Sequence, residues 1–494
     1  MADSGVVFIP LTQKVPMSTN PIETGMATSD AGKHPAAEGS SLARHMKPRQ
    51  LIMMSLGCAI GTGLFVGSGK GITAAGPAIL VAFLIASFLV VLIMRMLGEM
   101  AAVDPSSGSI SVFAQKALGR TAGATVGWLW WAQLFIVIAA EATAAASILH
   151  SLWPVASQWA SALVFMVALT AINLLGVKNF GEMEFWFAVL KIGAIIVFLV
   201  IGVALLLNFI PGVPSPGFSN LHSHGGFMPN GIAGVASGLL LVVFSFGGME
   251  IVTIAAAETP DPERNVGRAI RTVLWRIILF YVGSVLIMVT VLPWDSELLA
   301  NSPFVAVLTF AGLPGADIAM SIVIVTALLS SLNANLYGAS RLLFSMAERG
   351  SAPRMFARLT ARSVPQLAVL GSVSFGFVAV VLNYIWPTTV LRFLLNAVGS
   401  TTIVLWSAII ICQLILRYRA DRTGQRLPLR MWGFPYLSYT ALAILGGVVV
   451  LSFTDAAARN QIIATFLVTA GIAVACRVAG SRSSRGESQT SVSP

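Results

Sequence analysis

Two apolar segments broken by glycine carry the strongest chemical signal in this sequence. They cover Ile60–Phe65 and Phe244–Gly248, and each lies midway along a stretch long enough to cross a bilayer. A glycine-rich break frees backbone N–H and C=O groups at a depth where lipid offers them no partner. Such a break is tolerated only where it lines a cavity or binds something. Two breaks at matching places in two halves of a chain are typical of a solute-binding site in a membrane transporter.

The first break predicts a site for an anion. Two helix-weakening glycines flank the β-branched Thr62, and an unwound stretch there would turn N–H groups toward a carboxylate at the start of a half-helix. In the second break, freed carbonyls would accept hydrogen bonds from an ammonium group, with Phe244 and Phe246 as apolar walls or as a gate. The alternatives are close packing through small residues and an ordinary core role for the phenylalanines. The predicted binding residues of the two breaks are Ile60, Gly61, Thr62, Gly63, Leu64, Phe244, Ser245, Phe246, Gly247 and Gly248.

Charged residues inside apolar segments form a second candidate group, because they are costly in a membrane and are often functional. Glu141, Lys191 and Glu250 lie inside such segments, whereas Arg392 opens one and could reach the interface. Burial disfavours the charged form of a lysine, so Lys191 could gain and lose a proton near neutral pH. A permanent ion pair with a buried carboxylate is the alternative. Glu141 could hold a substrate ammonium, carry a proton or only pair with a neighbour. Lys191, Glu141 and Glu250 are the predicted proton-coupling residues.

Asn333, Asn335 and Tyr337 add polar side chains to a further apolar segment. Asn333 and Tyr337 share a helix face, so Asn333 is a candidate binding residue, with interhelical hydrogen bonding as the alternative. The five histidines and three cysteines form no metal-ligand pattern. We therefore predict no metal site, no cofactor and no disulfide framework.

These residues require a scaffold of membrane-spanning helices. The 494-residue chain is 56% hydrophobic and only 10% charged. Apolar runs of about 18 residues or more recur along it, which predicts an all-α multi-span membrane protein. We predict twelve spans, at residues 50–69, 76–97, 124–149, 159–176, 185–207, 231–255, 271–292, 318–343, 366–386, 389–416, 434–453 and 460–478.

The distribution of basic residues supports this count. All but four of the 30 lysines and arginines fall in the predicted tails or in the regions after even-numbered spans; the exceptions are Lys70, Lys191, Arg392 and Arg459. By the positive-inside rule, both termini then lie in the cytoplasm. The net charge of +10 therefore reflects topology and does not indicate a nucleic-acid partner.

The order of the spans predicts an inverted repeat. Spans one to five and six to ten have opposite orientations because five is odd, as an inverted repeat requires. The predicted domains are a disordered cytoplasmic N-terminal tail (1–49), a first five-helix repeat (50–207), a second, inverted five-helix repeat (231–416), two further helices (434–478) and a cytoplasmic C-terminal tail (479–494).

Several stretches resemble signatures of the amino acid permease family of the amino acid–polyamine–organocation superfamily. Ile60–Phe65 resembles the first-span signature, and Gly181–Lys191 resembles the entry of the fifth span. Phe244–Glu258 with Trp275–Tyr281 resembles the long sixth-to-seventh signature, and Tyr337–Arg341 matches span eight. The resemblance extends over nearly all of the predicted membrane domain.

The resemblance implies a LeuT-type fold of two inverted five-helix repeats plus two C-terminal helices. It also implies uptake of an amino acid across the cytoplasmic membrane coupled to protons. In relatives, a lysine of span five takes the place that sodium occupies in sodium-driven members, and Lys191 matches it. A glutamate of span three that is implicated in substrate handling matches Glu141.

Within the family, Gly226–Gly231, Glu250–Glu258 and Arg430–Trp432 look most like γ-aminobutyrate permeases. The first break departs from the Gly-Ala-Ser pattern of those permeases, since Gly61–Gly63 reads Gly-Thr-Gly. γ-Aminobutyrate is therefore the first expected substrate, and proline, D-serine, D-alanine, glycine and aromatic amino acids are the alternatives.

Other function classes fit less well. A membrane enzyme would need a clustered catalytic set, and the one histidine near a span is His150 at a span's end, so we expect no enzyme. A non-transporting sensor on the same fold would bind substrate without flux. The expected partners are an amino acid, protons and the lipid bilayer, and the sequence leaves the oligomeric state open.

Overall fold

The computed structural model describes residues 48–57, 60–175, 177–257, 259, 261–361, 363–386, 390–454 and 456–490. This part of the chain is helical and contains no β-strand. The predicted disordered tail, residues 1–49, lies outside the described residues except for its last two positions, so that prediction is not tested.

Seven helical stretches of the described chain are long and apolar enough to cross a membrane. They are Gly63–Val103, Arg120–Leu152, Gly181–Leu206, Ala316–Glu348, Gln366–Ile385, Phe393–Thr423 and Ala458–Ala479. Four shorter apolar helices accompany them, at Gln158–Leu174, Gly231–Val243, Ile278–Val291 and Tyr436–Ser452. The described part of the chain is thus all-helical, and its long apolar helices are those of a multi-pass membrane protein.

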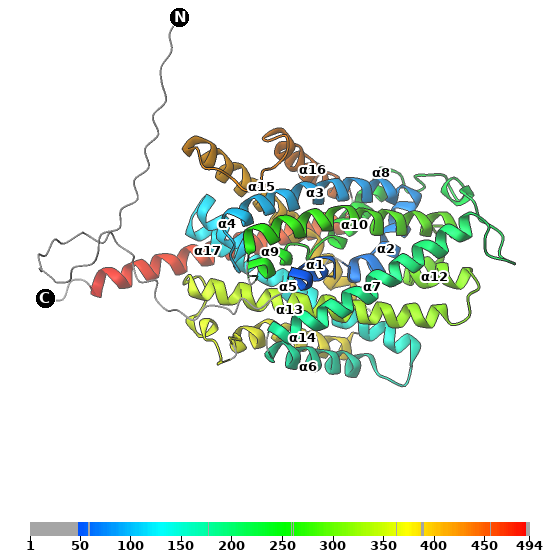
Figure 1. Ribbon diagram of the computed structural model, residues 1–494, viewed down its shortest axis with the longest axis horizontal. Helices are drawn as coiled ribbons and strands as arrows, with labels where there is room; N and C mark the ends of the chain where they lie inside the picture. Colours follow the sequence, from blue (N-terminus) through cyan, green and yellow to red (C-terminus); the bar gives the residue numbers. More distant parts are fainter. Residues whose placement is uncertain are drawn as a thin grey trace, which may run out of the picture. The chain divides into compact units, whose positions relative to one another are not determined.

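The helices follow the predicted segments closely (Figure 1). Every predicted span overlaps a helix, and the first and sixth each overlap more than one because a break divides them. The α-helices are α1 (Pro48–Gly57), α2 (Ser68–Ala75), α3 (Ile79–Val103), α4 (Ser109–Leu118), α5 (Arg120–Leu152), α6 (Gln158–Leu174), α7 (Val177–Leu206), α8 (Gly231–Ser245), α9 (Ile251–Ala257), α10 (Pro262–Val291), α11 (Glu297–Asn301), α12 (Pro303–Phe310), α13 (Ala316–Glu348), α14 (Gln366–Ile385), α15 (Val390–Thr423), α16 (Tyr436–Ser452) and α17 (Ala456–Thr490). A π-helical turn, η1 (Gly63–Gly67), precedes α2.

Several helices run past the ends that hydropathy predicts. α3 continues to Val103, α15 continues to Thr423, and α7 begins at Val177 rather than at residue 185. The added turns carry charged residues that lower the local hydropathy, but many of these side chains are buried and paired inside the protein. The short helices α4, α11 and α12 were not predicted, because each is shorter than a span.

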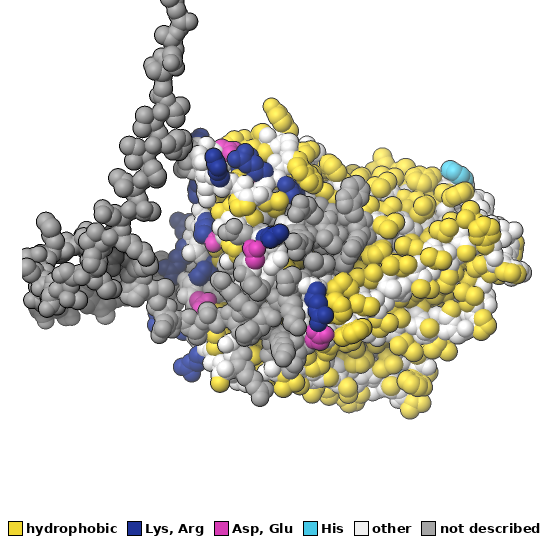
Figure 2. Space-filling view, in the orientation of Figure 1, with side chains coloured by type: hydrophobic (Ala, Val, Ile, Leu, Met, Phe, Trp, Pro, Cys, Tyr) yellow, Lys and Arg dark blue, Asp and Glu magenta, His cyan; other side chains and the backbone are white. Residues whose placement is uncertain are grey.

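The loops after α3, α13 and α15 meet at one end of the bundle. Arg349 donates to Gln115 Oε1 (2.7 Å), and Arg419 donates to the Lys116 carbonyl (2.8 Å). On the face shown in Figure 2, Lys and Arg side chains gather over one end and hydrophobic side chains cover much of the rest. These loops therefore lie on the same side, as the alternation of basic residues requires.

Loops at the other end are joined by a separate set of hydrogen bonds. Asn230 donates to the Ala74 carbonyl (2.9 Å), and the Trp294 indole donates to the His224 carbonyl (2.8 Å). This end includes the loop 208–230, which contains no lysine or arginine.

Candidate functional site

Both predicted breaks are present. α1 ends at Gly57, and the helix resumes at η1 from Gly63 onward. α8 ends at Ser245, residues 246–250 form turns, and α9 begins at Ile251. Gly248 has φ +96°, a conformation that a residue with a side chain rarely adopts.

The two breaks touch each other. The Ser245 hydroxyl on α8 donates to the Gly63 carbonyl at 2.8 Å. A Cβ added to Gly63 would collide with the Cα of Ser245, so only glycine allows this approach. Gly63 therefore acts as a packing residue between the two broken helices, which is the alternative that the sequence left open for this position.

Glu141 from α5 is bound to the first break. Its carboxylate accepts the Thr62 N–H (3.2 Å to each oxygen) and the Thr62 hydroxyl (2.5 Å). Ser331 on α13 donates a further hydrogen bond to Glu141 Oε1 at 2.8 Å. A Cβ on Gly61 would meet the same carboxylate and Ser331. The unwound peptide thus holds a carboxylate, as the half-helix argument predicts, but the carboxylate belongs to the protein.

Other backbone groups of the breaks stay available. Among the described residues, no acceptor is found for the N–H groups of Gly61 and Gly63, and no donor is found for the carbonyls of Phe246 and Gly247. Donors therefore remain in the first break and acceptors in the second, and the two breaks are in contact. Backbone donors and acceptors of this kind are the groups that the two ends of a zwitterion would need.

Lys191 on α7 lies behind the first break. Its ammonium donates to the carbonyls of Gly57 (2.6 Å) and Ile60 (3.3 Å), and the side chain is 1% exposed. It is also close enough to Glu184 and Glu141 to interact with both electrostatically. The lysine thus joins the end of α1 to two buried carboxylates.

Glu184 is a buried acid that the sequence analysis missed. It is fully buried, accepts a hydrogen bond from Ser330 on α13 (2.6 Å) and faces Gly57. The predicted fifth span began one residue later, at 185, which excluded it from the search for charges in spans. Its spacing of seven residues from Lys191, two helical turns on one face, is the signal that could have found it.

Aromatic rings pack beside the second break. Phe246 is fully buried and stacks on Tyr281 of α10 at a centroid distance of 4.6 Å, and Phe83 of α3 contacts both rings at 6.2 Å. The Tyr281 hydroxyl donates to the Ser245 carbonyl at 2.9 Å. Phe246 is thus part of a buried aromatic cluster, while the side chain of Phe244 lies outside the described residues.

Glu250 holds the second break in shape. Its carboxylate accepts the Gly248 N–H (3.0 Å) and the indole N–H of Trp406 on α15 (2.5 Å). The side chain is 5% exposed and no Lys or Arg of the described residues forms a salt bridge with it. Glu250 therefore lies apart from the Lys191 cluster, and the structure does not bring all three predicted coupling residues together.

The remaining predicted residues have simpler surroundings. Ile60 and Leu64 are fully buried. Asn333 is also buried and accepts a hydrogen bond from Asn173 of α6 at 2.7 Å, which is the interhelical bond offered as its alternative role. Arg341, counted among the basic residues after the eighth span, is instead 1% exposed inside α13, with its guanidinium over the Tyr337 ring. The side chain of Arg392 lies outside the described residues.

Known proteins resemble this chain along most of its length. The model of the family described as Amino acid permease matches residues 50–482. The chain is 47% identical to the aromatic amino acid transport protein AroP of Corynebacterium glutamicum, an alignment that covers 88% of this chain and 94% of that protein. It is 45% identical to the gamma-aminobutyric acid permease of Bacillus subtilis, covering 87% of this chain and 92% of that one.

The chain belongs to the amino acid permease family. Its relatives are transporters and not enzymes. The permease also shares its fold with a solved mutant of the Eremococcus coleocola manganese transporter, with a TM-score of 0.57 over 87% of this chain and 92% of that one. At 15% identity this likeness concerns the fold alone.

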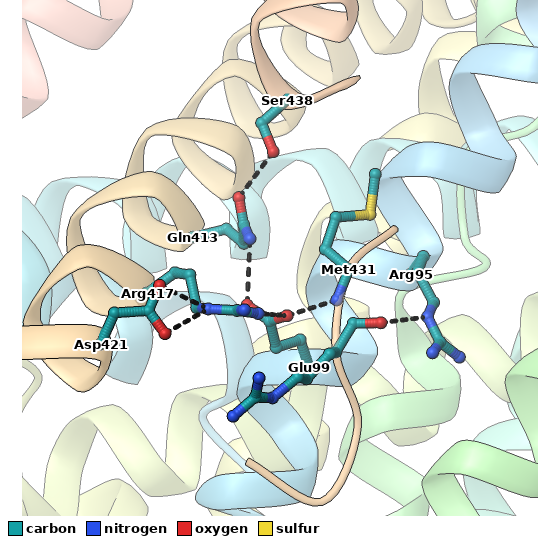
Figure 3. A network of polar contacts seen from close by, with 8 residues as sticks. Arg95, Glu99, Gln413, Arg417, Asp421, Met431 and Ser438 are labelled. Carbon is teal, nitrogen blue, oxygen red and sulfur yellow. Dashed lines mark hydrogen bonds and ion pairs between the residues drawn. The ribbon is translucent and has the colours of Figure 1, made fainter. Parts of the chain in front are cut away.

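A second buried polar network of the permease is shown in Figure 3. It lies toward the end of the bundle where Lys and Arg side chains gather (Figure 2), which we call the basic end. Glu99 of α3 forms an ion pair with Arg417 of α15 (2.8 Å), and both side chains are at most 9% exposed. Glu99 also accepts bonds from Gln413 (3.0 Å) and from the Met431 N–H. Arg417 pairs in addition with Asp421 at 3.0 Å. This network ties α3 and α15 to the segment before α16, far in sequence from the two breaks.

Proposed function

We propose that this permease imports a neutral amino acid, γ-aminobutyrate first, across the cytoplasmic membrane by proton symport with alternating access. The observation that carries the proposal is the contact between two broken helices beside the buried groups Glu141, Lys191 and Glu184. Broken helices supply peptide dipoles that can bind the charged ends of a zwitterion. The name of the Bacillus subtilis relative supports γ-aminobutyrate as the substrate.

The proposed architecture has twelve spans. Five of them from α1 to α7 form the first repeat, five from α8 to α15 form the inverted second repeat, and α16 and α17 follow. The two breaks then fall in the first span of each repeat, as inverted symmetry requires. The basic end is the cytoplasmic one, and both termini lie there.

Substrate binding begins with a competition between carboxylates. The substrate carboxylate takes the N–H groups of Gly61, Thr62 and Gly63, which requires Glu141 to leave Thr62. The released Glu141 then pairs with the substrate ammonium, together with the carbonyls of the second break. Asn333, which lies on α13 two residues from Ser331, is the further proposed binding residue.

Proton coupling passes through Lys191. Its ammonium holds the ends of the first break through the carbonyls of Gly57 and Ile60. Loss of the proton removes a charged donor that contributes about 1.5–3 kcal/mol per hydrogen bond, so the first break is freer to move when the lysine is neutral. Glu141 and Glu184 receive or return the proton, and Glu250 is the second, separate candidate.

The test is a competition panel in proteoliposomes with labelled γ-aminobutyrate, with and without an imposed pH gradient. We expect uptake that the gradient drives and that unlabelled γ-aminobutyrate inhibits most strongly. If γ-aminobutyrate neither enters nor competes, the substrate assignment fails. Binding without flux for every amino acid tested would favour a sensor.

The Lys191→Ala variant tests the coupling role. It should lose gradient-driven accumulation while retaining some substrate binding. Full accumulation by this variant would refute the role of Lys191.

An aromatic amino acid is the second candidate substrate. The relative from Corynebacterium glutamicum is named an aromatic amino acid transport protein, and the cluster of Phe83, Phe246 and Tyr281 borders the second break. Such rings can stack on an aromatic side chain. Stronger inhibition by phenylalanine, tyrosine or tryptophan than by γ-aminobutyrate would favour this candidate. Proline, D-serine, D-alanine and glycine complete the panel.

A further inference from the structure

A large groove lies outside the substrate region, between α5, the loop after α13 and α17. Its volume is about 850 Å³. Its walls include Arg120, Trp128 and Trp131 from α5, residues 350–353 of the loop, and Ile472 and Arg477 from α17. Of the seven candidate spans of the described chain, the one on α17 is the least buried, with 11% of its apolar window covered, so the groove opens toward the side of the protein that faces lipid.

Positive charge marks one end of the groove. Arg120 begins α5 and Arg477 lies near the end of the apolar part of α17, and both are exposed. Neither arginine forms a salt bridge with a carboxylate of the described residues. Cys476 of α17 lies against Thr125 of α5, close in sequence to both arginines, so Arg120 and Arg477 lie at the same end of the groove. Arg120 follows Lys116 and Ala117, whose carbonyls accept hydrogen bonds from Arg419, so this is the basic end of the bundle.

The deeper part of the groove is apolar. Trp128 and Trp131 pack edge to face at 5.5 Å. Their indole N–H groups are already used within the protein, on the Ser351 carbonyl and the Ser372 hydroxyl, each at 3.0 Å. The ring surfaces toward the groove thus present carbon, which suits a hydrocarbon chain and not a polar headgroup.

The length of the groove matches one leaflet. From Arg120 to Trp131, α5 rises about 16 Å at 1.5 Å per residue. Half of a hydrocarbon core is about 15 Å. A cation pair at the membrane surface followed by an apolar channel of this depth fits the headgroup and one acyl chain of a single phospholipid.

We propose that this groove binds an anionic phospholipid. The headgroup phosphate lies between Arg120 and Arg477, and an acyl chain lies along Trp128 and Trp131. Charge favours this occupant over the chain's own N-terminal tail, because residues 1–47 contain as many acidic as basic residues. A zwitterionic lipid brings an ammonium group along with its phosphate and so offers the two arginines no net negative charge, and an uncharged lipid offers no anion at all.

The bound lipid would act on transport through the helices that it touches. α5 carries Glu141, and α13, which precedes the loop, carries Ser331, the donor to that carboxylate. A lipid that fills the space between α5, the loop and α17 fixes α5 at its basic end. We therefore expect anionic lipid to stabilise the permease and to support uptake.

The experiment uses the purified full-length permease in a neutral detergent. Phosphatidylglycerol, phosphatidylcholine with identical acyl chains, and inorganic phosphate are titrated in parallel. Retained lipid is counted by native mass spectrometry, and the melting temperature is recorded. We expect phosphatidylglycerol alone to be retained and to raise the melting temperature.

Matched variants locate the lipid. Each arginine near an anionic lipid contributes about fivefold in affinity, so Arg120→Gln/Arg477→Gln should bind phosphatidylglycerol about 25-fold more weakly. The control Arg422→Gln/Arg426→Gln removes the same charge from exposed positions outside the groove and should bind normally. Ala475→Trp should displace the lipid by filling the groove while keeping both arginines.

Three results would overturn the proposal. The first is equal retention of phosphatidylcholine and phosphatidylglycerol, which would show that charge does not matter. The second is equal weakening by the control variant, which would indicate a diffuse surface effect. The third is stabilisation by inorganic phosphate as strong as that by phosphatidylglycerol, which would indicate a site for a soluble anion.

Discussion

Gly57→Ala tests whether the close approach of α1 to α7 holds the Lys191 ammonium in position against the carbonyls of the first break. An added Cβ would lie 2.7 Å from Glu184 Oε1, 3.3 Å from Ala188 Cβ and 3.5 Å from Lys191 Nζ. Real Cβ atoms do not approach an oxygen to 2.7 Å, so the carboxylate or α1 must move. The carboxylate is held by Ser330 at 2.6 Å, and any movement of α1 shifts the carbonyl that accepts the lysine.

The size of the effect follows from the bond at risk. A hydrogen bond from a charged donor contributes about 1.5–3 kcal/mol, and the Lys191–Gly57 bond is short, at 2.6 Å. If this bond is lost in the conformation in which the proton is transferred, coupled uptake should slow about 10- to 150-fold. One methyl group in a packed interior costs about 1–3 kcal/mol in stability, so the variant should still fold.

The assay compares two modes in proteoliposomes, with whichever amino acid the competition panel identifies. Accumulation driven by a pH gradient should fall 10-fold or more in the variant, while counterflow at equal pH, which needs no net proton movement, should fall much less. Gly193→Ala is the matched control on α7, because its Cβ would meet no heavy atom within 4 Å. Accumulation by Gly57→Ala at the wild-type rate would refute the reasoning.

Two further variants probe the packing of the breaks and the network at the basic end. Gly63→Ala is expected to lower the melting temperature and to abolish stabilisation by substrate, because its Cβ would collide with the Ser245 backbone, which cannot rotate away; thermal unfolding with and without substrate measures both, and unchanged melting would contradict the contact. Glu99→Gln is expected to destabilise the protein by about 3 kcal/mol, since it leaves the buried Arg417 without its full counter-charge. In chemical denaturation the double variant Glu99→Gln/Arg417→Met should recover part of that loss, and strictly additive losses would argue against a coupled pair.

The breaks themselves could be predicted because glycine acts locally. Gly61, Gly63 and Gly248 weaken a helix wherever they occur in it, and the sequence alone locates them within apolar runs. Their partners could not be predicted, because contact between Gly63 and Ser245 joins residues far apart in the chain. The sequence therefore locates the unwound peptide but does not show which groups contact it.

The buried charges show the limit of hydropathy. Glu184, Glu99 and Arg417 all fall just outside predicted spans, since a window that averages hydropathy ends a span where charges begin. The helices continue through these residues because Ser330, Arg417 and Glu99 supply partners inside the protein. A charge just outside a predicted span can thus be buried and paired in this permease, as these three residues are.

In the proposed mechanism, the position of Glu141 links substrate binding to protonation. In the proposed binding step Glu141 leaves Thr62, so its carboxylate loses the bonds from the Thr62 N–H and hydroxyl and keeps the bond from Ser331. A buried carboxylate that loses most of its donors is stabilised by gaining a proton or a cation. When the substrate is a zwitterion of the right length, its ammonium group compensates the charge of Glu141. When the substrate has another length, a proton on Glu141 must do so. Selectivity for substrate length and the need for a proton then both follow from one exchange of carboxylates at Thr62. We therefore expect the number of protons carried per substrate to change with the distance between the charged ends of the substrate.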